Sequence, residues 1–377
     1  MSGIYIHIPF CKQACHYCDF HFSTSLKKKG EMVQALVQEI YLRKYELSES
    51  VIETIYFGGG TPSILSTVDI QQIIEAVYQN FPVAKNPEIT LEANPDDLSL
   101  AVLQSYKEIG INRLSIGVQS FFDDDLKLMN RAHSAAESLA CLQNARTLFD
   151  NITIDLIYGI PGMSHEKWEQ NIQTALSLHI PHISSYALTV EPKTALHKMV
   201  SSGQVAQPSD QSAQEHFLYL ADALQAAGFI HYEVSNFARE GYFSKNNSGY
   251  WLGKKYLGIG PSAHSYDGQK RSWNIANNSL YIKAIAQGEL PSESETLTFE
   301  DRYNETIMTG LRTIWGVSLA RIESEFGLET LSHLQTQAQK YRDNGWLEIK
   351  EGQLVTTRAG KFMADGIASD LFLLHLK

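Results

Sequence analysis

Three of the four cysteines in the chain lie within eight residues, at Cys11, Cys15 and Cys18. Thiols crowded at this spacing point their sulfurs toward one centre, and in a reducing compartment they favour metal ligation over a disulfide. Three thiolates match the protein ligands of an iron–sulfur cluster with one open iron, whereas a structural zinc site normally takes four protein ligands. The fourth cysteine, Cys141, falls in a predicted helix and is interpreted as a small buried apolar residue.

A zinc site remains an alternative, because His7, His16 or His21 could supply a fourth ligand beside the three cysteines. A glycine-rich segment at residues 57–63, Phe-Gly-Gly-Gly-Thr-Pro-Ser, weighs against zinc. It closes a predicted strand, and the missing side chains would let an amino or carboxylate group of a ligand reach the backbone. Together with the cysteine loop, it favours a [4Fe-4S] cluster whose open iron takes a methionine-type ligand through its amino and carboxylate groups.

Composition and charge restrict the class of protein. The 377 residues are 44% hydrophobic and 19% charged, as expected for a folded globular protein. The length predicts two or three domains, or one large barrel with an appendage. The formal net charge of −11 disfavours nucleic acid as a partner. The sequence has no apolar run long enough for an integral membrane segment and no targeting pattern at residues 1–9, so we expect a cytoplasmic protein.

The apolar pattern alternates between strands and helices through the first half of the chain. The predicted strands are residues 4–8, 54–57, 88–91, 113–118, 152–158 and 182–189. The predicted helices between them are residues 32–45, 68–80, 98–109, 135–149 and 165–178. Strict alternation indicates parallel βα units. We therefore predict an α/β fold with a partial (β/α)6 TIM-like barrel; an open Rossmann-like sheet is the alternative that periodicity does not exclude.

The pattern changes twice after the barrel, which gives predicted domains at residues 1–192, 193–298 and 299–377. In the middle, bridging region we expect a helix at 209–227 and one strand at 232–237. The last region shows helices at 299–313, 319–325 and 329–344, a hairpin at 346–356 with its turn at Glu351-Gly352, and a final helix from Arg358. This is the order of a winged helix in an α+β domain. A winged helix suggests DNA binding as one alternative. Because the basic residues here are interspersed with acids, we interpret the region instead as a packing or substrate-covering module.

Several motifs together resemble those of one known family. They are Tyr-Ile-His-Ile-Pro-Phe-Cys-x3-Cys-x-Tyr-Cys-Asp-Phe at 5–20, Tyr-Phe-Gly-Gly-Gly-Thr-Pro-Ser at 56–63, Glu-Ala-Asn-Pro at 92–95, Gly-Val-Gln-Ser at 117–120, Met-Asn-Arg-Ala-His at 129–133, Asp-Leu-Ile-Tyr-Gly-Ile-Pro-Gly at 155–162 and Leu-Gly-Ile-Gly-Pro-Ser-Ala-His-Ser at 257–265. The chain thus resembles the radical S-adenosylmethionine (SAM) superfamily, and within it the branch that holds oxygen-independent coproporphyrinogen III oxidases and HemW-type haem chaperones. The resemblance runs nearly end to end and implies a partial (β/α)6 barrel followed by a C-terminal domain.

The resemblance also implies a set of cofactor-binding residues. Cys11, Cys15 and Cys18 match the cluster ligands of the family. The positions that match its SAM contacts, including the aromatics beside the cluster and the adenine, are Tyr5, Tyr17, Gly59, Gly60, Thr61, Glu92, Gln119, Arg131, Asp155, Ala187 and His264. The residue types suit the ligand, because acids and amides bind ribose hydroxyls and an arginine can take a carboxylate bidentately.

Two departures favour the chaperone over the oxidase. The oxidases resemble Cys-x3-Cys-x2-Cys-x-Cys, whereas the fourth cysteine position here is Phe20. The oxidases also carry an extension ahead of the motif, and this chain reaches Tyr5 almost at once. The resemblance therefore implies a haem-binding protein that passes haem to acceptor apoproteins, with an electron-donor protein as a further partner. Oxidative decarboxylation of the propionates of coproporphyrinogen is the alternative.

Haem-contacting residues are expected where the chaperones carry His-Asn-x-x-Tyr-Trp. The corresponding residues here are Asn246, Asn247, Tyr250 and Trp251. Asn246 stands in place of the histidine, and an amide is not a usual axial ligand of haem. His133, His231 or His264 could replace it, although each is individually more typical of a hydrogen-bonded structural residue.

Overall fold

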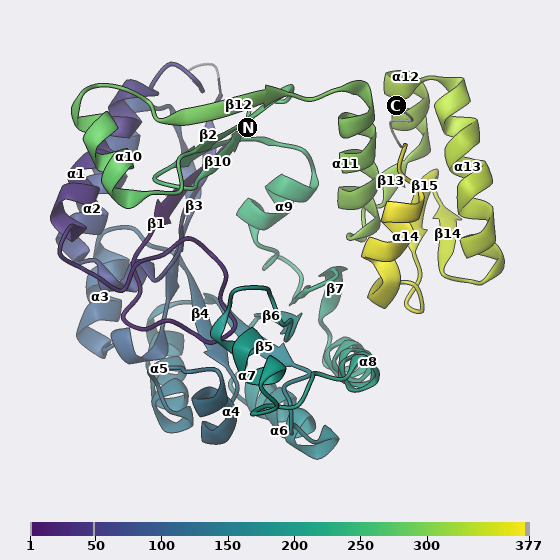
Figure 1. Cartoon of the computed structure of the whole chain (residues 1–377), viewed down its shortest axis with the longest axis horizontal. Coiled ribbons are helices and arrows are strands. Elements are labelled where there is room, and N and C mark those ends of the chain that lie inside the picture. Colours follow the sequence, from purple (N-terminus) through teal and green to yellow (C-terminus); the bar gives the residue numbers. More distant parts are fainter. Residues whose placement is uncertain (1, 48–49, 374–377) are drawn as a thin grey trace.

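A row of six parallel strands forms the centre of the protein. The computed structural model describes residues 2–47 and 50–373. The strands are β1 (Ser2–Ile8), β2 (Ile52–Gly59), β3 (Val83–Ala93), β4 (Arg113–Gln119), β5 (Asn151–Tyr158) and β6 (His182–Ala187). They lie side by side in chain order, as Figure 1 shows. A doubly wound sheet would reverse its order at a switch point, so the structure confirms the partial (β/α)6 barrel and not the Rossmann-like alternative.

Six helices follow these strands along the chain. They are α1 (Lys29–Leu42), α2 (Thr67–Asn80), α3 (Leu100–Glu108), α4 (Asp123–Leu128), α5 (Ala135–Leu148) and α6 (His165–Ser177). Ser66 and Ser134 begin α2 and α5 with capping boxes, in which each hydroxyl accepts from the backbone three residues on. Strand residues such as Ile4 and Ile6 are fully buried between sheet and helices, as is usual for parallel strands covered by helices.

The sheet extends beyond the six predicted strands at both edges. On the β1 side, β9 (Lys255–Ile259) pairs parallel with β1, and three antiparallel strands follow it. These are β10 (His264–Tyr266), β11 (Lys270–Asn274) and β12 (Ser292–Thr296), with α10 (Asn278–Ala286) between the last two. The sequence did not predict β9 to β12. The boundaries at residues 192 and 298 stay a prediction.

The other edge corrects one predicted element. The single strand expected at 232–237 is wrong, because the structure has two antiparallel strands, β7 (Ile230–Glu233) and β8 (Asn236–Ala238), and β8 lies beside β6. Between them the Glu233 carboxylate accepts hydrogen bonds from the Ser235 backbone N–H (3.0 Å) and the Asn236 amide (2.6 Å). These bonds stabilise a tight turn within a segment that the sequence pattern predicts to be one continuous strand. The helices of this region are α7 (Ala195–Ser201), α8 (Asp210–Ala226) and α9 (Lys245–Trp251).

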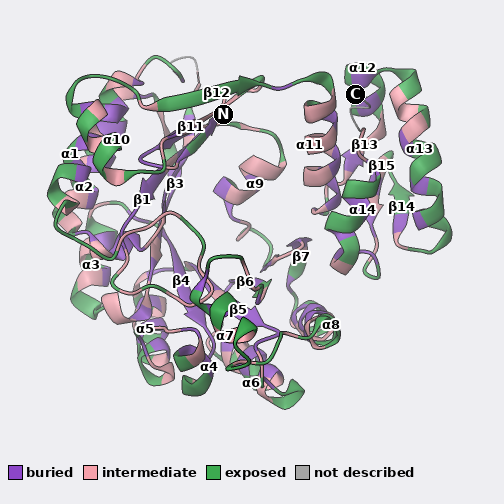
Figure 2. Ribbon diagram, viewed as in Figure 1, coloured by how far each residue is buried: buried purple, intermediate pink, exposed green. Residues whose placement is uncertain are grey.

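The C-terminal part folds around a second apolar core, visible in Figure 2 as buried faces that point inward between its helices. Its elements are α11 (Phe299–Leu311), β13 (Val317–Ser318), α12 (Leu319–Phe326), α13 (Leu328–Asp343), β14 (Leu347–Lys350), β15 (Gln353–Thr356) and α14 (Ala364–Asp370). The helices and the hairpin confirm the winged-helix pattern, and β13 adds a short third strand beside β15.

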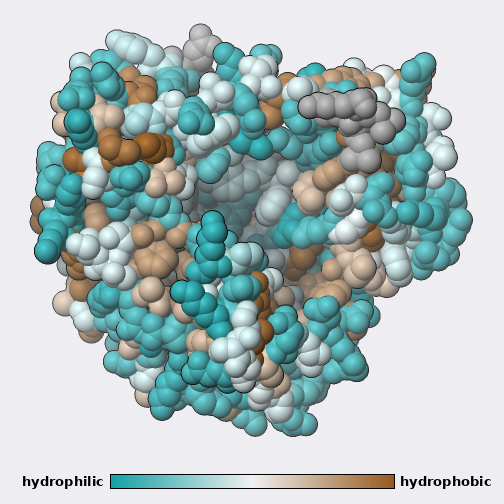
Figure 3. Space-filling model, viewed as in Figure 1, coloured by the Kyte–Doolittle hydropathy of each residue, from teal (hydrophilic) through white to brown (hydrophobic). Residues whose placement is uncertain are grey.

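Charged groups join this C-terminal module to the rest of the protein. Arg312 pairs with the buried Glu233, and Arg358 pairs with Asp222 on α8. Lys361 donates to the His231 carbonyl at 2.5 Å, and burial lowers the pKa of its ammonium to about 8. Figure 3 shows a hollow in the face between the barrel and this module, with α9 behind it in the view of Figure 1. Among residues 2–47 and 50–373, no helix is long and apolar enough to cross a membrane.

Candidate functional site

The cysteine loop follows β1 at the carboxyl edge of the sheet and is held there by backbone hydrogen bonds. The Cys11 N–H donates to the Ser23 carbonyl at 3.1 Å, which closes the base of the loop. The His16 N–H donates to the Met129 carbonyl (3.1 Å), and the His16 carbonyl accepts from the Leu196 N–H (2.7 Å). The loop is thus fixed to the connections that follow β4 and β6, so its position depends on the completed barrel.

All three predicted cluster ligands are half-buried free thiols. Burial raises the pKa of Cys11, and it raises the pKa of Cys18 to about 11. Cys15 is different, because its sulfur accepts a hydrogen bond from Arg131 Nη1 at 3.2 Å. No three His, Cys, Asp or Glu side chains in the described ranges are drawn together around a point where one metal ion would be held. In a cubane cluster each thiolate binds a separate iron, so three cluster ligands need not converge on one point.

The histidines that could complete a zinc site are engaged elsewhere. The His16 ring lies 2.8 Å from the Leu128 carbonyl through Nδ1. His7 lies 3.1 Å from the Tyr5 hydroxyl and 3.0 Å from the His21 carbonyl, and burial lowers its pKa to about 4, so its ring is neutral. His21 Nε2 lies 2.8 Å from the Asn278 side-chain oxygen. These contacts weigh against the Cys3His alternative.

The glycine turn after β2 packs against the start of the cysteine loop. The Gly60 N–H donates to the Ile8 carbonyl (2.9 Å) and the Thr61 N–H to the Phe10 carbonyl (2.7 Å). A Cβ on Gly60 would lie 2.5 Å from the Phe10 oxygen, and Gly59 has a φ of +106°. Only glycine permits both the close approach and the positive φ. The turn therefore needs its glycines, which let its backbone pack directly against the start of the cluster loop.

Glu92 links this turn to the barrel interior. Its carboxylate accepts from the Tyr56 hydroxyl (2.7 Å) and from the Gly59 N–H (3.2 Å), and burial raises its pKa. The Tyr5 ring stacks on Tyr56 with centroids 6.1 Å apart. Tyr5, Gly59 and Glu92, predicted from three separate motifs, are thus brought together.

Arg131 connects the loop to the ends of β3 and β4. Besides Cys15, it donates through Nη2 to the Asn94 side chain (2.6 Å) and to the Gly117 carbonyl (2.9 Å). Its buried Nε has no hydrogen-bond partner among the described residues. An unsatisfied buried donor is costly, and it fits a ligand that brings a carboxylate or another acceptor. Gln119, which ends β4, is buried and has a φ of +68°, a strained conformation of the kind found at ligand sites.

Asp155 lies inside the barrel on β5 and accepts no hydrogen bond from a described residue. Burial, and next the nearby Glu92 charge, raise its pKa to about 7. Burial also raises the pKa of Tyr17, from the cysteine loop. The nearby Arg131 charge lowers this pKa, and the Asp155 charge raises it. Neither Glu92 nor Asp155 forms an ion pair with a described residue. Their carboxylate oxygens can therefore accept hydrogen bonds from hydroxyl groups, which is the chemistry of ribose binding. Ala187 ends β6 at the same edge.

The predicted haem-contacting stretch forms α9, and its residues point in different directions. Asn246 is 5% exposed, and its amide oxygen accepts from the Thr54 hydroxyl at 3.0 Å, so it faces the strands and not a cavity of useful size. Asn247 lies in the first turn of α9, where its backbone N–H donates a hydrogen bond to Ser244 Oγ. Trp251 packs under the Arg312 guanidinium at 5.1 Å. Of these four residues, Tyr250 lines the 420 Å³ cavity described next, and Tyr250 and Trp251 both line the smaller space beside the C-terminal module.

Two adjoining cavities open beside the cysteine loop. One, of about 420 Å³, is lined by Tyr5, His7, Phe20, His21, Tyr250, Tyr256, Ser262 and His264. The other, of about 490 Å³, is lined by Tyr256, His264, Arg271, Trp273 and Glu295. Both fall in the size range of ligand sites. His264 and Tyr256 belong to both walls, so the two cavities adjoin at these two side chains.

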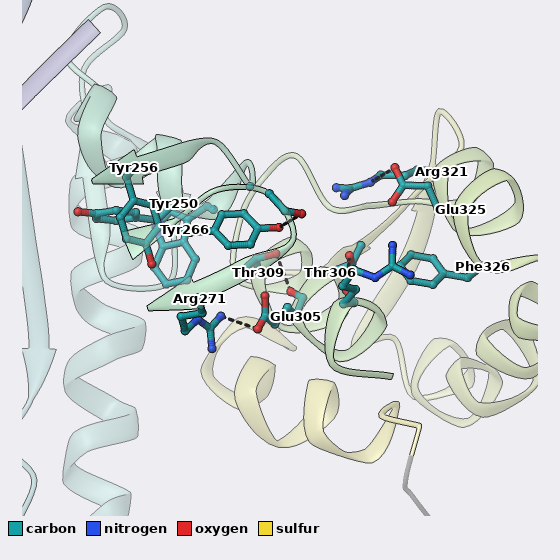
Figure 4. A pocket seen from close by; sticks show the side chains of 14 residues that line it. Tyr250, Tyr256, Tyr266, Arg271, Glu305, Thr306, Thr309, Arg321, Glu325 and Phe326 are labelled. Atoms are coloured by element: carbon teal, nitrogen blue, oxygen red, sulfur yellow. Dashed lines mark hydrogen bonds and ion pairs between the residues drawn. The ribbon is translucent and has the colours of Figure 1, made fainter. Parts of the chain in front are cut away.

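A third space separates this region from the C-terminal module. Figure 4 shows Tyr250, Tyr256 and Tyr266 on one side and residues of α11 and α12 on the other. Its volume is about 250 Å³. Arg271 pairs with Glu305 across it, as the dashed line in Figure 4 marks.

Sequence reasoning missed several residues of the site. Asn94, Tyr56 and Tyr256 were not assigned roles, and His7 was considered only as a zinc ligand, although His7, Tyr56 and Asn94 lie inside motifs that were recognised. His7 follows Tyr5 by two residues in a strand, which places both on one face and could have identified it. Tyr256 and Arg271 carry no such signal, because the strands that hold them were not predicted.

Comparison with known proteins agrees with this geometry. The family described as "Radical SAM superfamily" matches residues 5–175, and "HemN C-terminal domain" matches residues 297–363. A protein of Bacillus subtilis named "Heme chaperone HemW" is 34% identical over 97% of this chain and 98% of its own length. A protein of the same name from Mycobacterium tuberculosis is 32% identical over 98% of this chain and 94% of its own. The chain belongs to the HemW family of radical SAM proteins.

The fold of this HemW-family chain is also similar to a solved structure. The coproporphyrinogen III oxidase HemN of Escherichia coli superimposes with a TM-score of 0.85 over 98% of this chain and 90% of the other, at 23% identity. That likeness confirms the predicted fold, a radical SAM barrel with a C-terminal domain. Membership of the superfamily implies a [4Fe-4S] cluster and SAM as cofactors.

Proposed function

We propose that this protein is a haem chaperone, which binds haem together with a [4Fe-4S] cluster and S-adenosyl-L-methionine and transfers the haem to acceptor apoproteins. One observation carries the proposal: the similarity to proteins named haem chaperones covers 97% of the chain, both the cysteine loop and the C-terminal module included. A likeness limited to the barrel would support only the cofactors.

Cys11, Cys15 and Cys18 would hold the cluster, which supplies an open iron and one-electron chemistry when bound. Around it, Arg131 offers an unsatisfied N–H to a carboxylate. The turn at Gly59, Gly60 and Thr61, whose N–H groups are bonded to Glu92, Ile8 and Phe10, would contribute the backbone carbonyls of its glycines. Glu92, Gln119 and Asp155 would bind the amino group and the ribose hydroxyls of SAM. Tyr5 and Tyr17 would pack on the cluster and the adenine, and Ala187 would close the far end. His264 belongs to this set by resemblance.

Haem would occupy the cavities beside the loop. Phe20 is 71% exposed at the rim, and Tyr250 and Tyr256 form an aromatic wall with their rings 4.7 Å apart. A flat apolar ligand suits such a wall better than a polar one. We place the protein in the cytoplasm, where thiols stay reduced. Its protein partners would be haem acceptors and a donor of electrons.

Coproporphyrinogen oxidation is the weaker candidate. The position of the fourth cysteine in the oxidase motif is Phe20 here, and its exposed ring offers no thiol to the site. No other described cysteine can replace it, because Cys141 is buried in α5.

A transfer experiment tests the proposal. The full chain, reconstituted anaerobically with iron and sulfide, is loaded with haem, separated from free haem and mixed with a haem-free b-type cytochrome. We expect haem to bind at about one per chain and to appear in the cytochrome faster than from free haem. Failure to bind haem would contradict the chaperone role. Conversion of coproporphyrinogen III to protoporphyrinogen IX with SAM and a reductant would favour the oxidase instead.

A further inference from the structure

The imidazole of His264 is the unusual group in the cavities beside the cysteine loop. His7 and His21 also line this space, but each ring is held by a hydrogen bond. The His264 ring makes no hydrogen bond to a described residue and only lies against Trp273, with centroids 6.1 Å apart. His264 is exposed and lines both cavities. A free imidazole in an aromatic cavity is available to an external ligand.

The backbone around His264 is built to hold it at this place. Ser262, two residues earlier, has a φ of +64°, which is uncommon for a non-glycine residue. A Cβ on Gly258 would lie 2.0 Å from the His264 carbonyl oxygen, so β10 can cross this close to β9 only because residue 258 is glycine. Strained and crowded backbone of this kind persists where the surroundings fix it, and it is typical of ligand sites.

The neighbouring strand supplies groups that suit a tetrapyrrole. Trp273 pairs with His264 across β10 and β11, and Arg271 pairs with Tyr266 on the same ladder. Trp273 and Arg271 are two residues apart, so they present their side chains on one face with His264. The Arg271 guanidinium is paired with Glu305, and five N–H donors leave some for a second carboxylate. The face thus combines an aromatic surface, an imidazole and a cation at its edge.

We propose that His264 is the axial ligand of the haem iron in this protein, with Tyr256 and Trp273 against the macrocycle and Arg271 at a propionate. This inference rests on the proposed function. It assigns to haem a residue that the family resemblance gives to SAM, and it explains how Asn246 can occupy the position of a histidine. Asn246 is buried against Thr54 on the sheet, whereas His264 has an open ring in the adjoining cavities.

Haem titration of the full chain, with the cluster assembled, tests the assignment. The absorption and electron paramagnetic resonance spectra of ferric haem report the axial ligand directly. We expect an imidazole-type spectrum for the wild type, its loss in His264→Ala with at least a 10-fold weaker affinity, and its return when imidazole is added. His264→Met should keep the fold and give a thioether-type spectrum. The matched control is His333→Ala on α13, whose ring also makes no hydrogen bond to a described residue and lines neither cavity.

The remaining outcomes distinguish failure of the ligand assignment from failure of the proposed function. An unchanged haem spectrum and affinity in His264→Ala would overturn the ligand assignment while leaving the chaperone role intact. If His264→Ala instead weakens only SAM binding, His264 is a SAM contact, as the resemblance implies. If the wild type binds no haem, the proposed function fails and this inference fails with it. Arg271→Gln should weaken haem binding several-fold and leave the spectrum unchanged. Haem dimethyl ester has no free propionate carboxylates, so the variant and the wild type should bind it equally well. If Arg271→Gln weakens binding of the ester as much as binding of haem, the propionate contact is contradicted.

Discussion

Arg131 donates a hydrogen bond from its guanidinium to the sulfur of Cys15 at 3.2 Å, although the two residues are 116 positions apart in the chain. The same guanidinium holds the ends of β3 and β4 through Asn94 and Gly117. The cluster loop and the barrel are therefore joined through one side chain, which still has an unsatisfied Nε.

We expect Arg131→Gln to weaken SAM binding roughly 10- to 100-fold, because a hydrogen bond to a charged group contributes about 1.5–3 kcal/mol. Isothermal titration of the anaerobically reconstituted chain measures the change. Arg146→Gln on α5, which bonds only a local carbonyl, is the control and should bind SAM normally. Equal affinities in all three proteins would remove Arg131 from the SAM site.

Cys15→Ala should prevent assembly of a complete cluster, because two thiolates cannot replace three at one cubane. Iron and sulfide analysis after reconstitution would then fall below the roughly four of each that a [4Fe-4S] cluster holds. Cys141→Ala is the matched control: Cys141 is buried in α5, away from the loop, so the variant should keep the full cluster with a small loss of stability. Full iron content in Cys15→Ala would rule out the three-ligand assignment.

The raised pKa of Asp155 predicts how the stability of the ligand-free chain depends on pH. Its pKa rises from the ordinary value of 3.8 to about 7 in the folded chain, so the folded state binds this proton more tightly than the unfolded state. The stability that this gives is present below pH 4 and is lost as the pH rises through 7. Asp155→Asn should therefore differ least from the wild type at the acid end of the range and be more stable at pH 8, by up to about 4 kcal/mol.

Urea denaturation between pH 4.5 and 8 measures this difference. The exposed Asp150→Asn controls for the loss of one negative charge. An Asp155→Asn curve parallel to that of the wild type would show that the Asp155 carboxyl does not carry the effect.

The six-strand barrel could be predicted from sequence because each of its strands is an apolar run closed by a turn residue, and each neighbour in space is also a neighbour in the chain. The three cysteines and the glycine turn could be found because their residue types and spacing are themselves typical of a cluster site and of a tight ligand-binding turn. Residues such as Glu92 and Arg131 required the family resemblance, since a lone acid or arginine is more often a cap or an ion pair.

The sheet extension that carries His264, Arg271 and Trp273 was not predictable in the same way. Its strands have three to five residues each, and β9 pairs with β1 across some 250 positions of chain. Local pattern contains no information on such a pairing. The turn at Glu233 was missed for a related reason: it is stabilised by side-chain hydrogen bonds inside an apolar run, not by glycine or proline.

Gly60→Ala should disturb the turn beside the cluster loop. The added Cβ would meet the Phe10 oxygen at 2.5 Å and the Ile8 oxygen at 2.8 Å, and both are backbone atoms that cannot swing away. Overpacking of this kind costs about 1–3 kcal/mol, so thermal denaturation should show a loss and reconstitution should yield less cluster. Gly30→Ala in α1, where the new Cβ has nothing within 4 Å, should instead be neutral or gain up to about 1 kcal/mol. Similar losses in both variants would contradict the steric argument.

Arg312→Ala should destabilise the junction with the C-terminal module far more than an exposed pair would suggest. Arg312 Nη2 lies 2.9 Å from the Glu233 carboxylate, whose side chain is 1% exposed, and removal of the arginine leaves that buried charge without its ion-pair partner. Breaking a buried pair from one side costs about 3–5 kcal/mol. Arg321→Ala is the control, because Arg321 and Glu325 are 49% and 43% exposed and such pairs contribute at most about 1 kcal/mol. Glu233→Gln tests whether the unpaired charge is the cause, because it removes the charge itself. In urea denaturation it should lower the free energy of unfolding less than Arg312→Ala does. An equal or larger loss would show that the hydrogen bonds to Ser235 and Asn236 in the turn, not the unpaired charge, determine the effect.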